Sequence, residues 1–234
     1  MNWQMKSWMI GLLTALLILG ATGLALAEAN DREFYVKVSM QNFGLEDDFQ
    51  WSALYATEDK SKVVAVPKLG SHNGAGLTIG ERIGRIAGEL SFYRTGLPTS
   101  FQFAEGGNVF HSSDSDCDLI SLDFKYYFVD PRENNLALYG LLGYSHARVK
   151  VDDNVGYFAS DGTLLGSDDS KFDGSGYNAG IGFLYQFDRI ALDGAILYNG
   201  LRFDRIKFGG TEYKPDPRLK SSTTVVRLGA VYRF

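Results

Sequence analysis

Serine, histidine and aspartate are the residues of this sequence that could carry chemistry, and a nucleophilic site would need a Ser hydroxyl next to a His base. Ser145 and His146 are adjacent in a segment with strand-like alternation, so their side chains are expected on opposite faces and cannot form one dyad. His72 and His111 lie in or beside long predicted loops, near the serines at 71, 112 and 113. A dyad carried by those loops stays open, although solvated loop residues are the simpler interpretation. We therefore predict that the chain is not an enzyme.

Carboxylates at alternate positions could bind Ca²⁺, and the run Asp114-Ser115-Asp116-Cys117-Asp118 has this spacing. It lacks the Gly and the distant Glu of a full calcium loop, so a solvated acidic loop is expected, as at Asp152-Asp153 and Asp168-Asp169. No metal site is predicted.

Two glycine pairs, Gly74-Ala75-Gly76 and Gly180-Ile181-Gly182, could be mistaken for parts of a nucleotide loop. Each lacks the Lys and the strand-to-helix setting that phosphate binding requires. In strands such glycines let the wall bend or leave room for bulky neighbours. We predict no cofactor.

Composition favours an all-β fold, because 27 Gly, 16 Phe and 13 Tyr accompany only 5 Pro. The formal charge is −5, and an acidic chain argues against nucleic acid as a partner. Cys117 is the only cysteine, so no internal disulfide can form. We expect Cys117 to be an unpaired thiol in a loop.

The first 27 residues are predicted to be a helical signal peptide. Lys6 is the only charged residue before Glu28, the stretch from Trp8 to Leu26 is apolar or small, and Ala25-Leu26-Ala27 fits signal peptidase. A retained membrane anchor is the alternative, since the stretch is nearly long enough to span a bilayer. Cleavage would leave residues 28–234 as the mature domain, with a formal charge of −6 once Lys6 is removed.

Beyond residue 27 no apolar run approaches the roughly 20 residues of a membrane helix, but alternating segments of about ten residues recur, as in tilted membrane strands. The clearest is the last, whose apolar face consists of Thr224, Val226, Leu228, Ala230, Tyr232 and Phe234 and whose opposite face includes Arg227 and Arg233. Segments around 120–128 and 177–187 repeat the pattern. Weaker segments lie at 34–41, 74–82, 86–93, 136–151 and 190–203. Eight strands are predicted.

Connection lengths alternate as in outer-membrane barrels, which have short periplasmic turns and long outer loops. Short turns are expected at Ile83–Arg85, Asp130–Asn135 and Asp188–Arg189. Long loops are expected at 42–73, 96–118, 152–175 and 204–221. Strand direction then predicts aromatic residues at the periplasmic interface, namely Phe34, Phe128, Phe187, Tyr232 and Phe234. Only Tyr177 and Tyr198 are expected at the outer interface.

A charge at the bilayer midplane costs roughly 2 to 4 kcal/mol on a barrel surface, so the charged face must point inward. This predicts a lumenal network of three cations and three anions: Lys37, Lys125, Arg227, Glu89, Asp123 and Asp193. Since an eight-stranded barrel is only wide enough to be filled by side chains, we expect no wide pore.

The sequence resembles the small outer-membrane β-barrel family, the OmpA/OmpX-like proteins with an outer membrane protein beta-barrel domain. The residues that carry the likeness are the terminal strand 225–234, the segment 138–144 and Gly180-Ile181-Gly182. The resemblance implies an eight-stranded antiparallel up-and-down transmembrane barrel in the outer membrane of a Gram-negative cell. It also implies that Tyr232 and Phe234 form the signal read by the β-barrel assembly machinery.

The predicted function is a monomeric integral outer-membrane protein with a plugged polar lumen, whose exposed loops serve structural, adhesion or surface-binding roles among outer-membrane lipid and lipopolysaccharide. The alternatives are a narrow solute channel, a lipid A modifying enzyme, and a soluble periplasmic barrel. In the soluble barrel the apolar face of each strand would line the interior and the charged face would be exposed to water.

Overall fold

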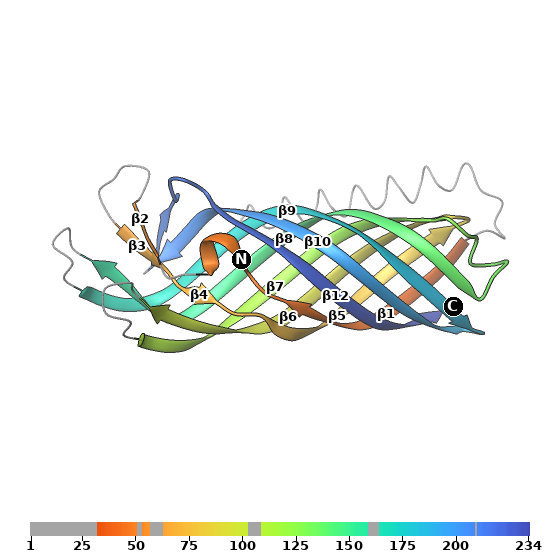
Figure 1. Ribbon diagram of the computed structural model, residues 1–234, viewed down its shortest axis with the longest axis horizontal. Coiled ribbons are helices and arrows are strands. Elements are labelled where there is room, and N and C mark those ends of the chain that lie inside the picture. Colours follow the sequence, from red (N-terminus) through yellow and green to blue (C-terminus); the bar gives the residue numbers. More distant parts are fainter. Residues whose placement is uncertain (1–31, 51–52, 57–62, 103–108, 159–163, 209) are drawn as a thin grey trace.

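The computed structural model describes residues 32–50, 53–56, 63–102, 109–158, 164–208 and 210–234. The predicted signal peptide at residues 1–27 lies outside these ranges. Within them, eight long antiparallel strands form a closed barrel (Figure 1). Their bounds are β1 Arg32–Phe43, β5 His72–Ile83, β6 Ile86–Gln102, β7 Val109–Tyr127, β8 Leu136–Phe158, β9 Leu164–Phe187, β10 Ile190–Phe208 and β12 Leu219–Arg233.

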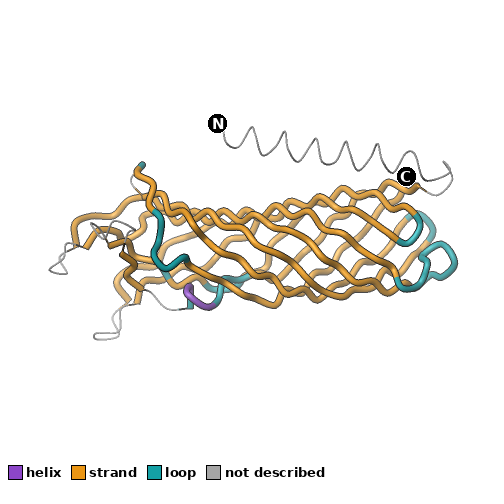
Figure 2. Tube along the Cα trace, turned by 90° about the horizontal axis from the view of Figure 1, so that it is seen from above, coloured by secondary structure: helices purple, strands orange, loops and turns teal. Residues whose placement is uncertain are grey.

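Each long strand pairs with its sequence neighbour in the barrel, and β1 closes the ring against β12 with Val38 opposite Ala230. The short turns lie at one end of the barrel, beside the C-terminus, whereas the other end carries longer extensions (Figures 1 and 2). These turns fall at Gly84–Arg85, 128–135 and Asp188–Arg189, as the turn chemistry predicted. Gly84 and Asp188 both have positive φ, which tight hairpin turns require. The predicted eight-stranded barrel is confirmed.

Apolar side chains cover the outer wall of the barrel, as a lipid environment requires. Leu142, Ile181 and Leu228 are 68%, 67% and 60% exposed, whereas Lys37 and Asp123 are fully buried. The inverted arrangement of a soluble barrel is therefore wrong. On β9 the exposed belt runs from Phe187 to Tyr177, which corresponds to roughly 25 Å at about 3.3 Å per residue and a tilt of about 40°.

Aromatic rings lie at both edges of this apolar belt. The five predicted periplasmic aromatic residues are all exposed on the outer wall, and Phe234 is the most exposed at 77%. At the outer edge, Tyr144 lies directly opposite Tyr177 on the neighbouring strand, and the rings of Tyr177 and Tyr198 are 6.0 Å apart. The predicted outer set missed Tyr144, because the alternation in its strand is noisy.

Three of the four predicted outer loops are wrong, because much of their length is strand. β8 and β9 have 23 and 24 residues, about twice the length needed to cross the bilayer, and they pair out to Val155 and Ser167 and beyond. β6, β7 and β10 also continue past the apolar belt. Residues 44–71 do connect β1 to β5, and the described part of this connection contains the 3-10 turn η2 Asp47–Phe49 and the short strands β2 Ala53–Ala56, β3 Val63–Val66 and β4 Lys68–Leu69.

The strand extensions form a stalk above the belt, and its interior is mainly apolar, with a few buried hydroxyl groups such as those of Thr99 and Ser115. Phe49 of η2 is fully buried there, with its ring 5.0 Å from that of Phe203 and 5.9 Å from that of Phe172. Asp48 and Asp47 tie η2 to β12, since they accept hydrogen bonds from the Lys220 backbone N–H and the Ser222 hydroxyl. η2 therefore caps the outer end of the lumen. The small strand β11 Thr211–Tyr213 pairs with the end of β10.

The acidic run at 114–118 is part of β7 and not a solvated loop, which corrects the sequence-based expectation. Asp116 and Asp118 face outward, while Cys117 faces inward and is only 1% exposed. Cys117 is a free thiol, as predicted, but in a buried strand position. The side chains of Asp114, Asp153 and Asp168 lie outside the described set. In the described part of the chain, no helix has the length and apolarity needed to cross a bilayer.

Candidate functional site in the barrel lumen

Four of the six predicted lumenal charges form a ring across the barrel. Lys37 of β1 and Lys125 of β7 alternate with Glu89 of β6 and Asp193 of β10. The Lys37 Nζ lies 2.9 Å from Glu89 Oε2 and 3.3 Å from Asp193 Oδ1. The Lys125 Nζ lies 2.8 Å from Glu89 Oε1 and 2.8 Å from Asp193 Oδ2. Every cation in the ring therefore contacts both anions.

Tyrosine hydroxyls complete the coordination of this ring. Tyr35 donates a hydrogen bond to Glu89 Oε1 at 2.8 Å, and Tyr139 donates to Asp193 Oδ2 at 3.0 Å. The Lys125 Nζ also lies 4.2 Å from the centroid of the Tyr139 ring, a cation–π distance. Buried charges are tolerated when they are paired and hydrogen-bonded in this way.

The other two predicted charges form a separate pair. The guanidinium NH1 of Arg227 lies 3.4 Å from Asp123 Oδ2, and its Cζ lies 4.7 Å from the Tyr93 ring centroid. Asn178 donates a hydrogen bond to Asp123 Oδ1 at 2.9 Å, and its own Oδ1 accepts from Ser145 and Asn199. This polar layer is fully buried.

The residues that connect these charges were not predicted from the sequence. Tyr35 and Tyr93 could have been found, because strand alternation places them on the same inward face as Lys37 and Glu89. Tyr139 and Asn178 lie on strands whose inward face carries few charges, so no sequence signal marked them. The glycine pairs make room for such rings: a Cβ at Gly182 would overlap Tyr139.

The periplasmic mouth of the lumen is closed by a second group of charges. Arg82 NH2 lies 2.9 Å from Glu33 Oε2, and Arg233 NH1 lies 3.4 Å from the same oxygen. Between these residues and the ring remains a void of about 10 Å³, the space of about one water molecule. In the adjacent turn, hydrogen bonds from Arg132 lower the pKa of Asp130 to about 2.

The histidine candidates do not assemble with a nucleophile in the described residues. Ser145 is fully buried in the lumen and donates to Asn178, whereas His146 faces outward with its Nε2 3.8 Å from Asp173 Oδ1. The predicted separation of Ser145 and His146 is therefore confirmed. His72 begins β5 and is exposed, and the side chain of His111 lies outside the described set. Among the described residues no three His, Cys, Asp or Glu side chains are grouped as metal ligands.

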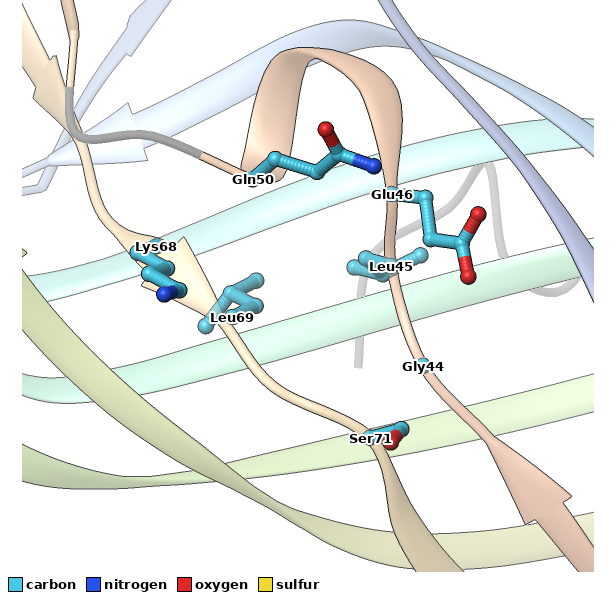
Figure 3. Close-up of a pocket in the computed structure, with 7 residues that line it drawn as sticks. All are labelled: Gly44, Leu45, Glu46, Gln50, Lys68, Leu69 and Ser71. Carbon is cyan, nitrogen blue, oxygen red and sulfur yellow. The ribbon is translucent and has the colours of Figure 1, made fainter.

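A pocket of about 270 Å³ lies at the outer end, between the segment that follows β1 and the segment around β4 (Figure 3). The side chains of Leu45 and Leu69 lie between the two segments, and both are buried. Glu46 and Lys68 lie on opposite sides, and the Glu46 carboxylate points away from Lys68 (Figure 3). The pocket thus combines an apolar floor with separated charges and holds no convergent catalytic set.

Solved structures to which this chain is similar include three outer-membrane proteins. OprG from Pseudomonas aeruginosa superimposes with a TM-score of 0.60 at 17% identity, covering 86% of this chain and 95% of its own. A major outer membrane protein from Thermus thermophilus has a TM-score of 0.49 at 13% identity (87% and 99% covered). Neisserial surface protein A has a TM-score of 0.45 at 16% identity (86% and 97% covered).

The sequence has no significant match among curated proteins. The family model of the outer membrane protein beta-barrel domain, in contrast, matches residues 12–234, almost the whole chain. The closed barrel and its lipid-facing belt agree with that match. The chain belongs to the outer membrane protein beta-barrel family and is an outer-membrane protein.

Proposed function

We propose that the protein is a non-conducting, non-enzymatic barrel that anchors a rigid β-stalk at the cell surface, where the stalk serves a structural, adhesion or surface-binding role. The observation that carries the proposal is the ring of Lys37, Glu89, Lys125 and Asp193. These side chains come from four strands spaced around the barrel, and all are buried. An eight-stranded barrel leaves no space beside such a ring for a wide water path.

The stalk supports the display role, because it is a packed structure and not a set of loose loops. Phe49 closes its interior, and the β8–β9 hairpin continues well beyond the apolar belt. Binding residues on such a scaffold would be held in fixed positions, which lowers the entropy lost on binding. The small pocket at Leu45 and Leu69 is one place where a surface ligand could be held.

The terminal strand supports the proposal that the β-barrel assembly machinery inserts this chain into the outer membrane as a monomer. Tyr232 and Phe234 project outward side by side at the periplasmic edge, with ring centroids 5.2 Å apart. Both rings are exposed on the outer wall of the folded barrel. We propose that these two side chains form the assembly signal.

Ion conductance of the purified protein in planar bilayers tests the closed lumen. We expect no steady open level for the wild-type chain. The double variant Lys37→Ala/Lys125→Ala leaves Glu89 and Asp193 without cations and is expected to conduct cations. Lys220→Ala, which removes an exposed lysine of the outer wall, is the control and should stay closed. Large steady conductance of the wild-type protein would instead establish the alternative of a narrow solute channel.

A further inference from the structure

Charged side chains form two rows on the outer wall, just beyond the apolar belt. The first row, the charge ladder, follows cross-strand partners from β6 to β10 and alternates in sign: Arg94, Asp118, Arg148, Asp173 and Arg205. Four of its members form ion pairs with one another, Arg94 with Asp118 and Arg148 with Asp173. For example, Arg148 Nε lies 2.7 Å from Asp173 Oδ1. The fifth member, Arg205, has its Nε 3.8 Å from Oδ1 of the adjacent Asp204, so every ladder residue has an ion-pair partner.

The second row differs, because it brings three cations together. Lys171 of β9 lies directly opposite Lys150 of β8 and Lys207 of β10, and all three side chains point outward. Like charges directly opposite each other destabilise a sheet. We call these three residues the lysine row.

No described residue forms an ion pair with the lysine row. The acids opposite its two ends are Asp116 and Glu212, and the exposed Asp152 and Asp169 lie two residues further out on β8 and β9. The Asp116 carboxylate is bound by Arg94, and neither Lys150, Lys171 nor Lys207 forms an ion pair with Glu212 or any other described residue. Three ammonium groups that form no ion pair with a described residue lie on adjacent strands, which are about 4.8 Å apart, and span roughly 10 Å. This arrangement suits an anion with more than one charged group.

The position of the lysine row selects the kind of anion. Lys150 and Lys171 each lie six residues beyond the interfacial Tyr144 and Tyr177 on the same strands. This corresponds to a height of about 15 Å above the edge of the apolar belt, at about 3.3 Å per residue and a tilt of about 40°. Lipid acyl chains pack against the belt below, so phosphates carried on the sugars of a glycolipid would lie at this height.

We propose that the lysine row binds the phosphate groups of a phosphorylated glycolipid of the outer leaflet, whose acyl chains pack against the belt around Tyr144, Tyr177 and Tyr198. The charge ladder lies between the two surfaces, and its three arginines and two aspartates span the depth of the sugar layer. Lysine ammonium groups bind phosphate as point charges, which tolerates the spread of phosphate positions on a sugar chain. The site is separate from the lumen and does not depend on whether the barrel conducts.

Binding of lipopolysaccharide to the refolded protein in maltoside micelles tests the proposal. Fluorescently labelled lipopolysaccharide with phosphorylated inner sugars is titrated and followed by anisotropy. Lys171→Gln/Lys207→Gln is compared with Lys214→Gln/Lys220→Gln, which removes the same charge from exposed positions outside the row. We expect the first double variant to lose at least about tenfold in affinity and the second to lose little. Enzymatic dephosphorylation of the lipopolysaccharide should weaken wild-type binding to a similar degree.

Three results would overturn the proposal. Equal losses in the two double variants would mean that general electrostatics govern binding. Undiminished binding of the dephosphorylated molecule would exclude phosphate as the recognised group. A sulfated oligosaccharide without acyl chains that binds the row as tightly as lipopolysaccharide would assign the row to soluble polyanions and not to lipid. The fold of every variant is checked by heat-modifiable gel mobility, so that loss of binding is separated from loss of structure.

Discussion

Lys37 and Glu89 lie on β1 and β6, two strands that are not neighbours, and their charged groups meet across the lumen at 2.9 Å. The full ring forms only when the barrel closes, because its members Lys125 of β7 and Asp193 of β10 are separated by β8 and β9 in the sheet and still meet at 2.8 Å. The ion ring therefore couples closure of the barrel to neutralisation of its charges.

Removal of one cation from the ring should destabilise the barrel strongly. Lys125→Met leaves two buried carboxylates with a single lysine, which costs about 3 to 5 kcal/mol for a broken buried pair. Adding Asp193→Asn to this variant should recover part of the loss, because the remaining Lys37 and Glu89 balance. Urea unfolding in phospholipid vesicles measures both variants. A loss below about 1 kcal/mol for Lys125→Met would mean that water enters the ring.

Gly182 should tolerate no side chain, because a Cβ there would overlap the ring and hydroxyl of Tyr139. We expect Gly182→Ala to displace the Tyr139 hydroxyl from Asp193 and to lower the temperature at which the folded gel band is lost. Gly88→Ala is a matched control, since a Cβ at Gly88 has open space around it. Equal behaviour of the two variants would contradict the role of Gly182 as space for the ring.

Phe49 should hold the stalk together without affecting the membrane belt. Phe49→Ala removes a fully buried ring, a change that costs roughly 3 to 5 kcal/mol in a packed core. Faster amide exchange is expected at the outer ends of β9 and β10, near Phe172 and Phe203, but not near Ile181. The lipid-facing Phe92→Ala serves as control. Exchange that increases along the whole barrel would show that the stalk and belt unfold as one unit.

The turn at Asp130 should give a pH-dependent stability. Hydrogen bonds from Arg132 lower the pKa of Asp130 to about 2, below its ordinary value of 3.8. Because the folded pKa is the lower one, the stabilisation is complete above pH 3.8 and is lost as the pH falls through about 2. The difference in unfolding free energy between wild type and Arg132→Gln should therefore shrink between pH 5 and pH 2. A difference that stays constant over that range would exclude the Asp130 pair as its source.

The lysine row should cost stability when no anion is bound. Lys171 lies between two other lysines, so Lys171→Gln is expected to stabilise the protein in phosphate-free detergent by roughly 0.2 to 1 kcal/mol. Added salt should reduce the gain by screening the repulsion. Thermal unfolding at low and high ionic strength measures it. A destabilised Lys171→Gln protein would show that the lysine stems contribute more by packing than their charges cost.

The sequence predicted the membrane part of this fold well and the outer part poorly. Alternation of period two is strong where one face meets lipid, so the last strand and the inward positions of Lys37 and Arg227 could be read directly. Beyond the belt both faces carry polar residues. Asp116 and Asp118, for example, lie on β7 and face outward, although the acidic run that contains them has the composition of a loop. Strand pairing there depends on the buried side chains of a distant segment, such as Phe49, which no local pattern reveals.

The way in which the lumenal charges group could not be predicted from the sequence either. Strand alternation placed six charges inside, but their division into a four-membered ring and a separate Asp123–Arg227 pair depends on strand register. Register in turn depends on turn lengths and on the stagger with which the barrel closes. The lysine row could not be predicted for the same reason. Lys150, Lys171 and Lys207 are far apart in sequence and become neighbours only through strand pairing.

Cys117 faces the apolar interior of the stalk at 1% exposure. Oxidants of the periplasm can therefore reach its sulfur only while the nascent chain is still open, and the finished barrel protects it from them. In intact cells a thiol that resists alkylating reagents would mark the molecules that have completed assembly, and a modified one would mark those that stalled on the way.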